Sequence, residues 1–151
     1  ATFFGTAFHK VSGRNQVAIP RAMIKALEAA DEGQLLLMRL GQEGFLRIYT
    51  QEQPDSKIDE IRNNEKLDAQ TRNAPVRRLA RNAVPFEPDA QGRFVLPANW
   101  VQELSLNDEV AFCGAFNWIE IWPAAARRDV EAQENENSAG TDKLLGEMLN
   151  G

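Results

Sequence analysis

The sequence is poor in the side chains that build disulfides and metal sites. It contains one cysteine, Cys113, and one histidine, His9. A disulfide within the chain is therefore excluded, and so are zinc sites that need several Cys or His ligands. The 151 residues also lack any apolar run near the ~18 residues that a membrane-spanning helix requires. The first residues have no basic start followed by an apolar stretch, so we expect no signal peptide and a reducing, cytoplasmic setting.

The chain does contain charge of both signs, unevenly placed. Its formal net charge is −5 and its pI is near 5.0, which argues against a nucleic-acid partner because phosphate binding depends on Lys and Arg. Residues 1–27 and 71–84 nevertheless hold basic side chains and no acid, whereas acids outnumber bases from Asp129 onward. The basic side chains are Lys10, Arg14, Arg21, Lys25, Arg72, Arg77, Arg78 and Arg81. This asymmetry is typical of a binding face with an acidic tail, but charge alone favours a solvated surface of mixed sign.

Two stretches of the chain resemble each other when they are aligned on a proline. Residues 12–20 read SGRNQVAIP and residues 89–97 read DAQGRFVLP, an offset of 77. The same offset matches Asp31 with Asp108. Each proline is followed by a short helical stretch, expected over 20–29 and 97–104, because proline suits a first helical turn. The chain therefore contains two copies of one motif.

Each copy continues with two apolar segments around a turn, which predicts a β-hairpin. The segments are 34–40 and 45–50 in the first copy, and 109–113 and 118–122 in the second. Helical spacing of apolar residues predicts helices over 54–64 and 67–83, ended by Pro85 and Pro88. Residues 131–141 are polar and favour a flexible segment, after which Leu144, Leu145, Met148 and Leu149 are spaced for a last amphipathic helix.

These elements predict a β-rich α+β protein with four parts. They are a first half at 3–52, connecting helices at 53–84, a second half at 85–130 and a polar tail at 131–151. A half of about 50 residues buries too little surface to fold comfortably alone. We therefore expect a pseudo-dimer in which strands from both halves form one barrel.

The turn before the second proline has a specific chemistry. Asp89 can accept hydrogen bonds from backbone N–H groups a few residues on, and Gly92 can adopt a positive φ without steric cost. Arg93 would then leave a rigid turn as a planar guanidinium group, suited to phosphate or to the O6 and N7 atoms of guanine. For one turn alone, a hairpin with a solvated arginine is the simpler interpretation.

Taken together, these residues resemble the MraZ family of bacterial transcriptional regulators, which have two tandem SpoVT-AbrB-type halves. The family opens roughly Phe-x-Gly-x-x-x-His-x-aliphatic-Asp-x-Lys-Gly-Arg-x-x-aliphatic-Pro, and the likeness covers about residues 3–130. The matching residues are Phe3, Gly5, His9, Val11, Ile19 and Pro20 in the first half, Asp89, Gly92, Arg93 and Pro97 in the second, and the stretches 76–79 and 116–122.

The resemblance implies a fold and a function. The fold would be two swapped-hairpin halves that form a pseudo-dimeric double-split barrel with helices between them. The function would be sequence-specific binding of tandem promoter repeats, in the division and cell-wall gene cluster, by a ring-shaped homo-oligomer at the nucleoid. It implies no cofactor, metal, membrane or small-molecule substrate. The residues expected to face DNA are Arg93, Gln91, Arg14, Gln16 and Lys10.

The first half departs from the family pattern at its turn. Ser12 stands in place of Asp, Arg14 in place of Lys, Asn15 in place of Gly, and Gln16 in place of Arg. Ser can still hydrogen-bond the turn, and Asn tolerates the left-handed conformation better than other non-glycine residues. Gln16 carries no charge, so it could contact adenine or a backbone oxygen in place of phosphate. Ser12 and Asn15 therefore shape the first turn as Asp89 and Gly92 shape the second.

Other candidate residues favour structural roles. His9 is expected to make a structural hydrogen bond in a strand, and Cys113 to be a small buried side chain. Trp100, Trp118 and Trp122 favour a core or a subunit interface over base stacking, and Asp108 with Glu109 favours a polar turn over a metal pair. No nucleophile–base or carboxylate pair stands out, so we expect no enzyme. Two alternatives remain: a protein-interaction module with weakened DNA binding, and an antitoxin-type regulator.

Overall fold

The computed structural model describes residues 2–31 and 34–151 and has an α+β architecture, as the sequence predicts. The strands are β1 (Thr6–Lys10), β2 (Gln16–Ala18), β3 (Leu35–Arg39), β4 (Leu46–Thr50), β5 (Ala83–Phe86), β6 (Arg93–Val95), β7 (Glu109–Gly114) and β8 (Ile119–Pro123). The helices are α1 (Arg21–Ala30), α2 (Glu52–Arg62), α3 (Ala69–Arg81), α4 (Ala98–Leu104), α5 (Ala124–Glu136) and α6 (Ser138–Asn150). The helices expected before β3, between the halves and before β7 are confirmed, and so are both hairpins.

The strands form two antiparallel sheets whose order reflects the internal repeat. The larger sheet has the order β1-β7-β8-β4-β3-β5, and β2 pairs with β6 in a separate two-stranded ribbon. The equivalent strands of the two copies are β1 and β5, β3 and β7, and β4 and β8. When each strand is replaced by its equivalent, the order of the larger sheet reads the same from the other edge. β1 and β5 are free edges of the larger sheet, so the strands described here form no closed barrel.

The registers reveal two-fold relations at two places. In the ribbon, Val17 pairs with Phe94, and the flanking pairs are related by the offset of 77. In the larger sheet, Arg47 pairs with Glu120, and the flanking pairs are related by an offset of 73. Strands of the first copy therefore pair with strands of the second around both centres.

The offset of 77 holds only as far as the start of the first helix in each copy. Pro20 and Pro97 precede α1 and α4, but α1 has ten residues and α4 has seven. The helices end at the left-handed residues Asp31 and Ser105. The match of Asp31 with Asp108 is therefore wrong, because α4 is shorter by about one turn.

The core lies between the larger sheet, the ribbon and the helices α1 and α4. Each of these contributes buried apolar side chains, among them Leu46, Ile121, Val17, Met23 and Trp100. Alternation along β4 and β8 directs their other side chains to the opposite face of the sheet. The sheet therefore has one face in the core and one that is only partly covered.

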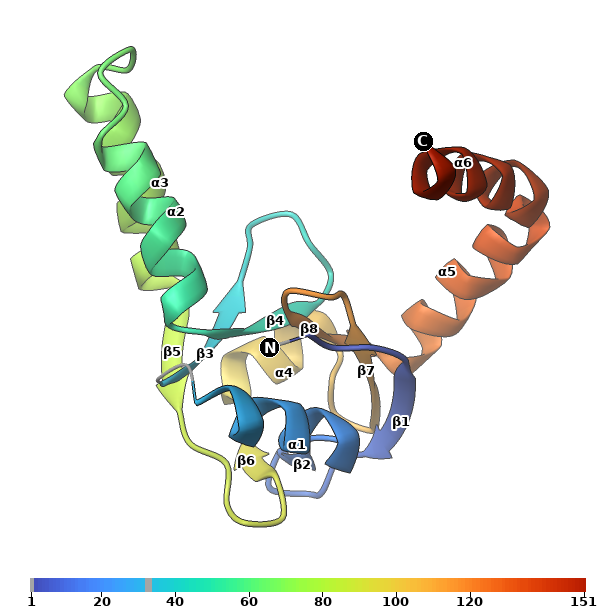
Figure 1. The fold of residues 1–151 in the computed structure, drawn as a ribbon. Coiled ribbons are helices and arrows are strands. Elements are labelled where there is room, and N and C mark those ends of the chain that lie inside the picture. Colours follow the sequence, from blue (N-terminus) through green and yellow to red (C-terminus); the bar gives the residue numbers. More distant parts are fainter. Residues whose placement is uncertain (1, 32–33) are drawn as a thin grey trace.

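Two helical arms extend from the sheet on the side away from the ribbon. Figure 1 shows α2 and α3 running side by side as one arm, and α5 leading to α6 as the other. Residues 131–141 lie in α5 and α6 apart from Asn137 between them, so the expectation of a flexible segment there is wrong. The stretch contains helix formers, and Glu131 pairs with Arg127 one turn earlier at 3.1 Å.

The helical region ends at Arg81, before Pro85 and Pro88 as predicted, and Pro85 itself lies inside β5. A proline is tolerated there because β5 is an edge strand that pairs only with β3. Across the described ranges, no helix is both long and apolar enough to cross a membrane.

Candidate nucleic-acid interface

The turns before β2 and β6 have the same hydrogen bonds. Ser12 N donates to Gln16 O at 3.0 Å and Asn15 N to Ser12 O at 3.0 Å. In the second turn Asp89 N donates to Arg93 O at 2.9 Å and Gly92 N to Asp89 O at 2.9 Å. The substituted first turn therefore keeps the backbone geometry of the second.

The side chains of Ser12 and Asp89 close their turns in equivalent ways. Arg93 N donates to Asp89 Oδ1 at 2.9 Å, and Gln91 N donates to the same oxygen at 2.9 Å. In the first turn Gln16 N and Arg14 N approach Ser12 Oγ at 3.2 and 3.4 Å. The serine bonds are longer and involve no charge, so they hold the turn less firmly.

A residue with positive φ stands at the same place in each turn. Asn15 has φ 59° and Gly92 has φ 82°. The carbonyl oxygen of each accepts a hydrogen bond from the residue that follows the opposite strand. Ile19 N donates to Gly92 O and Leu96 N donates to Asn15 O, each at 2.9 Å. The two turns are thus fastened to each other's strands, and the ribbon with its turns forms one connected unit.

Arg93 is held by its own turn. Its Nε donates to Asp89 Oδ2 at 2.7 Å, and both side chains are exposed. The backbone N–H and side chain of Arg93 stabilise the carboxylate and lower the pKa of Asp89. Within the described residues, this ion pair leaves both terminal amino groups of Arg93 without a partner. The guanidinium group is therefore fixed at one edge and open at the other.

The ribbon presents a small outer face next to the two turns. Val17 and Phe94 point into the core, while Gln16, Arg93 and Val95 are exposed and Ala18 is half-buried. Gln16 pairs with Val95 and Ala18 with Arg93 across the ribbon. Together these four residues form what we call the ribbon face.

Three further residues predicted to contact DNA flank the ribbon face. Arg14 and Gln91 occupy equivalent, exposed positions in the two turns, and Lys10 is exposed at the end of β1, just before the first turn. The offset of 77 places Glu87 where the first copy has Lys10. The first turn therefore has two cations near it but no arginine at its closing position, whereas the second has Arg93. The roles of these residues remain predictions.

The arginine cluster of α3 is not part of this surface. Figure 1 places α3 in the arm that extends to the side opposite the ribbon. Its arginines are therefore separated from Arg93, which local sequence patterns do not predict because they do not specify the direction of the arm.

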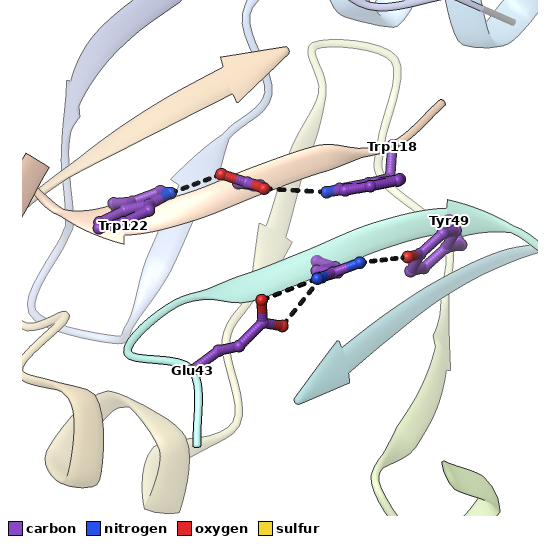
Figure 2. Close-up of polar contacts among 6 residues, drawn as sticks. Glu43, Tyr49, Trp118 and Trp122 are labelled. Atoms are coloured by element: carbon purple, nitrogen blue, oxygen red, sulfur yellow. Dashed lines mark hydrogen bonds and ion pairs between the residues drawn. The ribbon is translucent and has the colours of Figure 1, made fainter. Parts of the chain in front are cut away.

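A second polar cluster covers the outer face of β4 and β8 (Figure 2). Glu120 accepts hydrogen bonds from Trp118 Nε1 at 3.0 Å and from Trp122 Nε1 at 2.9 Å. On the neighbouring strand, Arg47 donates to both carboxylate oxygens of Glu43, at 2.9 and 2.7 Å, and to the hydroxyl of Tyr49 at 2.8 Å. The residues are all half-buried.

Ring contacts complete this cluster. The Arg47 guanidinium lies 4.4 Å from the centre of the Trp118 ring, and Phe45 stacks on Trp122 at 4.5 Å. Burial alone would lower the pKa of Arg47, but the bonds to Glu43 and Tyr49 outweigh it and raise that pKa. Each charged side chain of this cluster has a partner. The ring contacts between β4 and β8 therefore stabilise the pairing of these two strands. The sequence signal for this cluster is the alternation Trp118-x-Glu120-x-Trp122, which places one carboxylate between two indoles on one face of a strand.

The other candidate residues have structural positions. His9 Nδ1 lies 2.6 Å from Ala18 O, so the ring donates to that carbonyl as expected for a strand histidine. Cys113 is buried in β7, and burial raises the pKa of its thiol. Glu109 accepts a hydrogen bond from Arg128 at 2.9 Å. Trp100 is a core residue, whereas Trp118 and Trp122 lie on the outer sheet face. Among the described residues, no cluster of three or more His, Cys, Asp or Glu could hold a metal ion.

The fold and the ribbon define an α+β protein in which two copies of one motif pair through their strands, and its helices contain more residues than its strands, so the expected β-rich composition is wrong. A sequence profile described as "MraZ protein, putative antitoxin-like" matches residues 79–147. The transcriptional regulator MraZ of Mycolicibacterium vanbaalenii is 30% identical over 148 residues, which span 97% of this chain and 99% of that protein. The chain therefore belongs to the MraZ family, as the sequence motifs predict.

Two further relatives agree with this assignment. The transcriptional regulator MraZ of Mycobacterium avium is 28% identical over 97% of this chain and 99% of its own length. That of Ruegeria pomeroyi is 30% identical over 97% of this chain and 88% of its own length. These relatives are named as transcriptional regulators, a non-enzymatic class, which confirms the expectation that the chain is not an enzyme.

Proposed function

We propose that this protein is a sequence-specific DNA-binding transcriptional regulator that contacts DNA through the ribbon face and its two turns. The names of the relatives support the regulator class. The single observation that carries the site is the ion pair of Asp89 with Arg93 at 2.7 Å on an exposed β-ribbon. A two-stranded ribbon is of a size that enters the major groove of B-DNA.

In this proposal Arg93 reads a base. Because Asp89 holds Nε, the two terminal amino groups point outward in a fixed plane and can donate to the O6 and N7 atoms of guanine. The small apolar side chains Ala18 and Val95 on the same face can contact a thymine methyl group. Arg93 would thus combine with its neighbours to recognise more than one base pair.

The first turn acts differently. Gln16 occupies the position equivalent to Arg93 and can pair with adenine through its amide group. Lys10 and Arg14 supply positive charge for phosphates, and Gln91 bonds to the DNA near the second turn. The two turns would therefore recognise different sequences, although their backbones are alike.

The family's architecture and assembly extend this proposal. In this proposal the chain consists of two swapped-hairpin halves at 3–52 and 85–130, with helices at 53–84 and a tail at 131–151. Several copies assemble into a ring and bind tandem promoter repeats of the division and cell-wall gene cluster. Such an assembly needs few cations in each copy. Once one copy has bound a repeat, the neighbouring copies are held at a high effective concentration near the next repeat.

The test uses the protein's own upstream promoter fragment and a scrambled fragment of equal length. Arg93→Ala should cost about 1–3 kcal/mol on the promoter fragment and remove most of the preference over the scrambled one. Arg62→Ala is the matched control, since Arg62 is exposed at the end of α2 and carries the same charge. Equal preference in the two variants would refute the assignment of Arg93.

A second candidate is an antitoxin-type regulator, in which the protein also binds a toxin protein. The family profile's description and the acidic chain from Asp129 onward favour it. A related candidate is a protein-interaction module whose DNA binding has weakened, which the uncharged Gln16 favours. Either is indicated if an intact oligomer ignores duplex DNA at low salt and captures a protein through its C-terminal helices.

A further inference from the structure

The ribbon brings the helix of each copy of the motif beside the turn of the other copy. A Cβ atom on Gly92 would lie 3.0 Å from Ile24 Cγ1, so α1 packs directly against the second turn. At the opposite end, Asn15 of the first turn and Val101 of α4 line a pocket of about 380 Å³. The offset of 77 relates Asn15 to Gly92. It also relates Ile24 to Val101, so the two ends of the ribbon are built in the same way.

Two cations of α1 lie next to this contact. Arg21 and Lys25 are exposed and stand one helical turn apart, and Arg21 lies one turn before Ile24 on the same side of the helix. Their equivalents in α4 are Ala98 and Gln102, and both line the pocket beside the first turn. The same positions of α1 therefore border the second turn.

Both cations are available to an anion. Within the described residues, neither Arg21 nor Lys25 forms an ion pair. The acid of α1, Glu28, lies in the last turn of the helix and not at the end that follows the ribbon. The first two turns of α1 therefore present positive charge to the solvent.

The pairing of the copies divides the basic residues between the two ends of the ribbon. In the sequence, Lys10, Arg14, Arg21 and Lys25 all belong to the first copy. None of the equivalent residues of the second copy is basic; they are Glu87, Gln91, Ala98 and Gln102. Lys10 and Arg14 stay at the first end, whereas α1 carries Arg21 and Lys25 to the second end.

The second end has no free positive charge from its own copy. Arg93 is paired with Asp89 at 2.7 Å, and Glu87 is exposed beside that turn. These three residues together are net negative, which opposes the approach of a phosphate. Arg21 and Lys25 reverse the sign of the local charge, so α1 compensates for the acids of the second copy.

We propose that Arg21 and Lys25 of α1 bind DNA phosphates beside the second turn, as Lys10 and Arg14 do beside the first. This inference rests on the proposed function and adds a helix to its DNA-binding surface. Arg93 reads a base, and the two cations of α1 hold the backbone that flanks it. Phosphate contacts of this kind fix the position of a protein on the duplex and carry no sequence information directly.

The first test removes the two helix cations. Arg21→Gln combined with Lys25→Gln should weaken binding to the promoter fragment and to the scrambled fragment by the same factor. The slope of log K against log salt should become shallower by about 1.8 for each copy in contact with DNA, since each lost phosphate contact removes about 0.9. The preference for the promoter fragment should stay at the wild-type value, unlike that of Arg93→Ala.

The matched control is Arg77→Gln combined with Arg81→Gln. These arginines are exposed on α3 with the same spacing, in the arm on the side opposite the ribbon. The control removes the same charge and should keep the wild-type slope. An equal loss of slope in both double variants would refute the proposal, because net charge alone would then explain it. A wild-type slope in the folded Arg21→Gln/Lys25→Gln variant would also refute it.

The second test adds cations at the equivalent positions of α4. Ala98 and Gln102 are exposed, so Ala98→Arg with Gln102→Lys should place two cations beside the first turn. Added to the wild type, this pair should steepen the slope by about 1.8 for each bound copy. Added to the Arg21→Gln/Lys25→Gln variant, it should restore the wild-type slope. A slope that does not respond to the added cations would mean that these helix positions do not face DNA.

The outcome is separable from that of the proposed function. If the protein binds through Arg93 but keeps its slope without the helix cations, this inference is wrong and the proposed function is intact. If the slope falls without the helix cations while Arg93→Ala keeps its preference for the promoter, the phosphate contacts hold and the assignment of Arg93 is wrong. A wild-type protein that binds no duplex at low salt would refute both.

Discussion

Gly92 is constrained in two independent ways at the base of the second turn. Its φ of 82° is rarely adopted by residues with a side chain, and a Cβ atom there would lie 3.0 Å from Ile19 O and 3.0 Å from Ile24 Cγ1. Because Ile19 O belongs to the backbone of the paired strand, it cannot move freely. The residue therefore limits both the conformation of the turn and the closeness of the ribbon to α1.

We predict that Gly92→Ala lowers the free energy of unfolding by about 1–3 kcal/mol, since it adds both backbone strain and a close contact. Gly13→Ala is the control, because a Cβ at Gly13 meets nothing within 4 Å. That variant should lie within about 0.5 kcal/mol of wild type. Urea unfolding of the three proteins measures the difference, and equal stability of the two variants would contradict the role given to Gly92.

The stability of the same turn depends on pH through the carboxylate of Asp89. Its folded-state pKa is lowered because the backbone N–H and side chain of Arg93 stabilise the carboxylate. The stability it contributes is therefore fully present above the unfolded value of about 3.9 and is lost as the pH falls through the folded-state pKa. We predict that the gap in unfolding free energy between wild type and Asp89→Asn narrows as the pH falls from about 6 to about 3.

Denaturant unfolding of both proteins over that pH range tests this directly, and NMR titration of the Asp89 carboxyl group provides an independent value of its pKa. A gap that stays constant, or an Asp89 pKa at or above the ordinary value, would show that the turn does not hold the charged form.

At the scale of elements, the pairing of β4 with β8 depends on side chains from both copies of the motif. Glu120 satisfies the indole N–H groups of Trp118 and Trp122, and the Arg47 guanidinium of β4 lies 4.4 Å from the centre of the Trp118 ring. Removing the carboxylate leaves two half-buried donors without an acceptor. The strands of the two copies would then be held mainly by their backbone bonds and by the buried face.

We expect Glu120→Ala to cost about 1–3 kcal/mol in unfolding free energy and to shift tryptophan fluorescence to the red. Glu60→Ala serves as the control, since Glu60 is exposed on α2 and lies 3.5 Å from Lys57 in a surface pair. That change should cost less than about 1 kcal/mol. Similar costs for the two variants would mean that water replaces the Glu120 carboxylate as hydrogen-bond acceptor without a loss of stability.

The elements themselves could largely be predicted from local sequence. The matched stretches ending at Pro20 and Pro97 located the ribbon and the helices that follow it, because turn chemistry and proline act over a few residues. The offset failed beyond the helices, since it carries no information about helix length. The prediction of a flexible segment at 131–141 is wrong because the helix propensity of these residues outweighs their polarity.

The site was predictable only in part. Asp89, Gly92 and Arg93 act within five residues, so the sequence could predict their turn, and the structure keeps that geometry. The cluster around Glu120 and Arg47 joins residues 73 positions apart, and its partners follow from register alone. The separation of the α3 arginines from the ribbon follows from the direction of an arm, which short-range patterns do not specify.

At the scale of the whole molecule, the two copies share the backbone geometry of their turns but differ in charge. Around the first turn lie Lys10 and Arg14, whereas the second turn has Arg93, its partner Asp89 and, at the position equivalent to Lys10, Glu87. A chain with net charge −5 therefore concentrates the few cations of its proposed DNA-binding face beside one ribbon. Such an arrangement predicts binding that is both weak for a single copy and sensitive to salt.

The most direct measurement is the affinity for the upstream promoter fragment as a function of salt, for wild type, Arg93→Ala and Arg62→Ala. We expect wild type and Arg62→Ala to bind tightly at low salt, with log K falling steeply and linearly against log salt, by about 0.9 for each phosphate neutralised. Arg93→Ala should bind far more weakly, at the level of scrambled DNA. If Arg93→Ala keeps the wild-type affinity and slope, the ribbon face is not where this protein binds DNA.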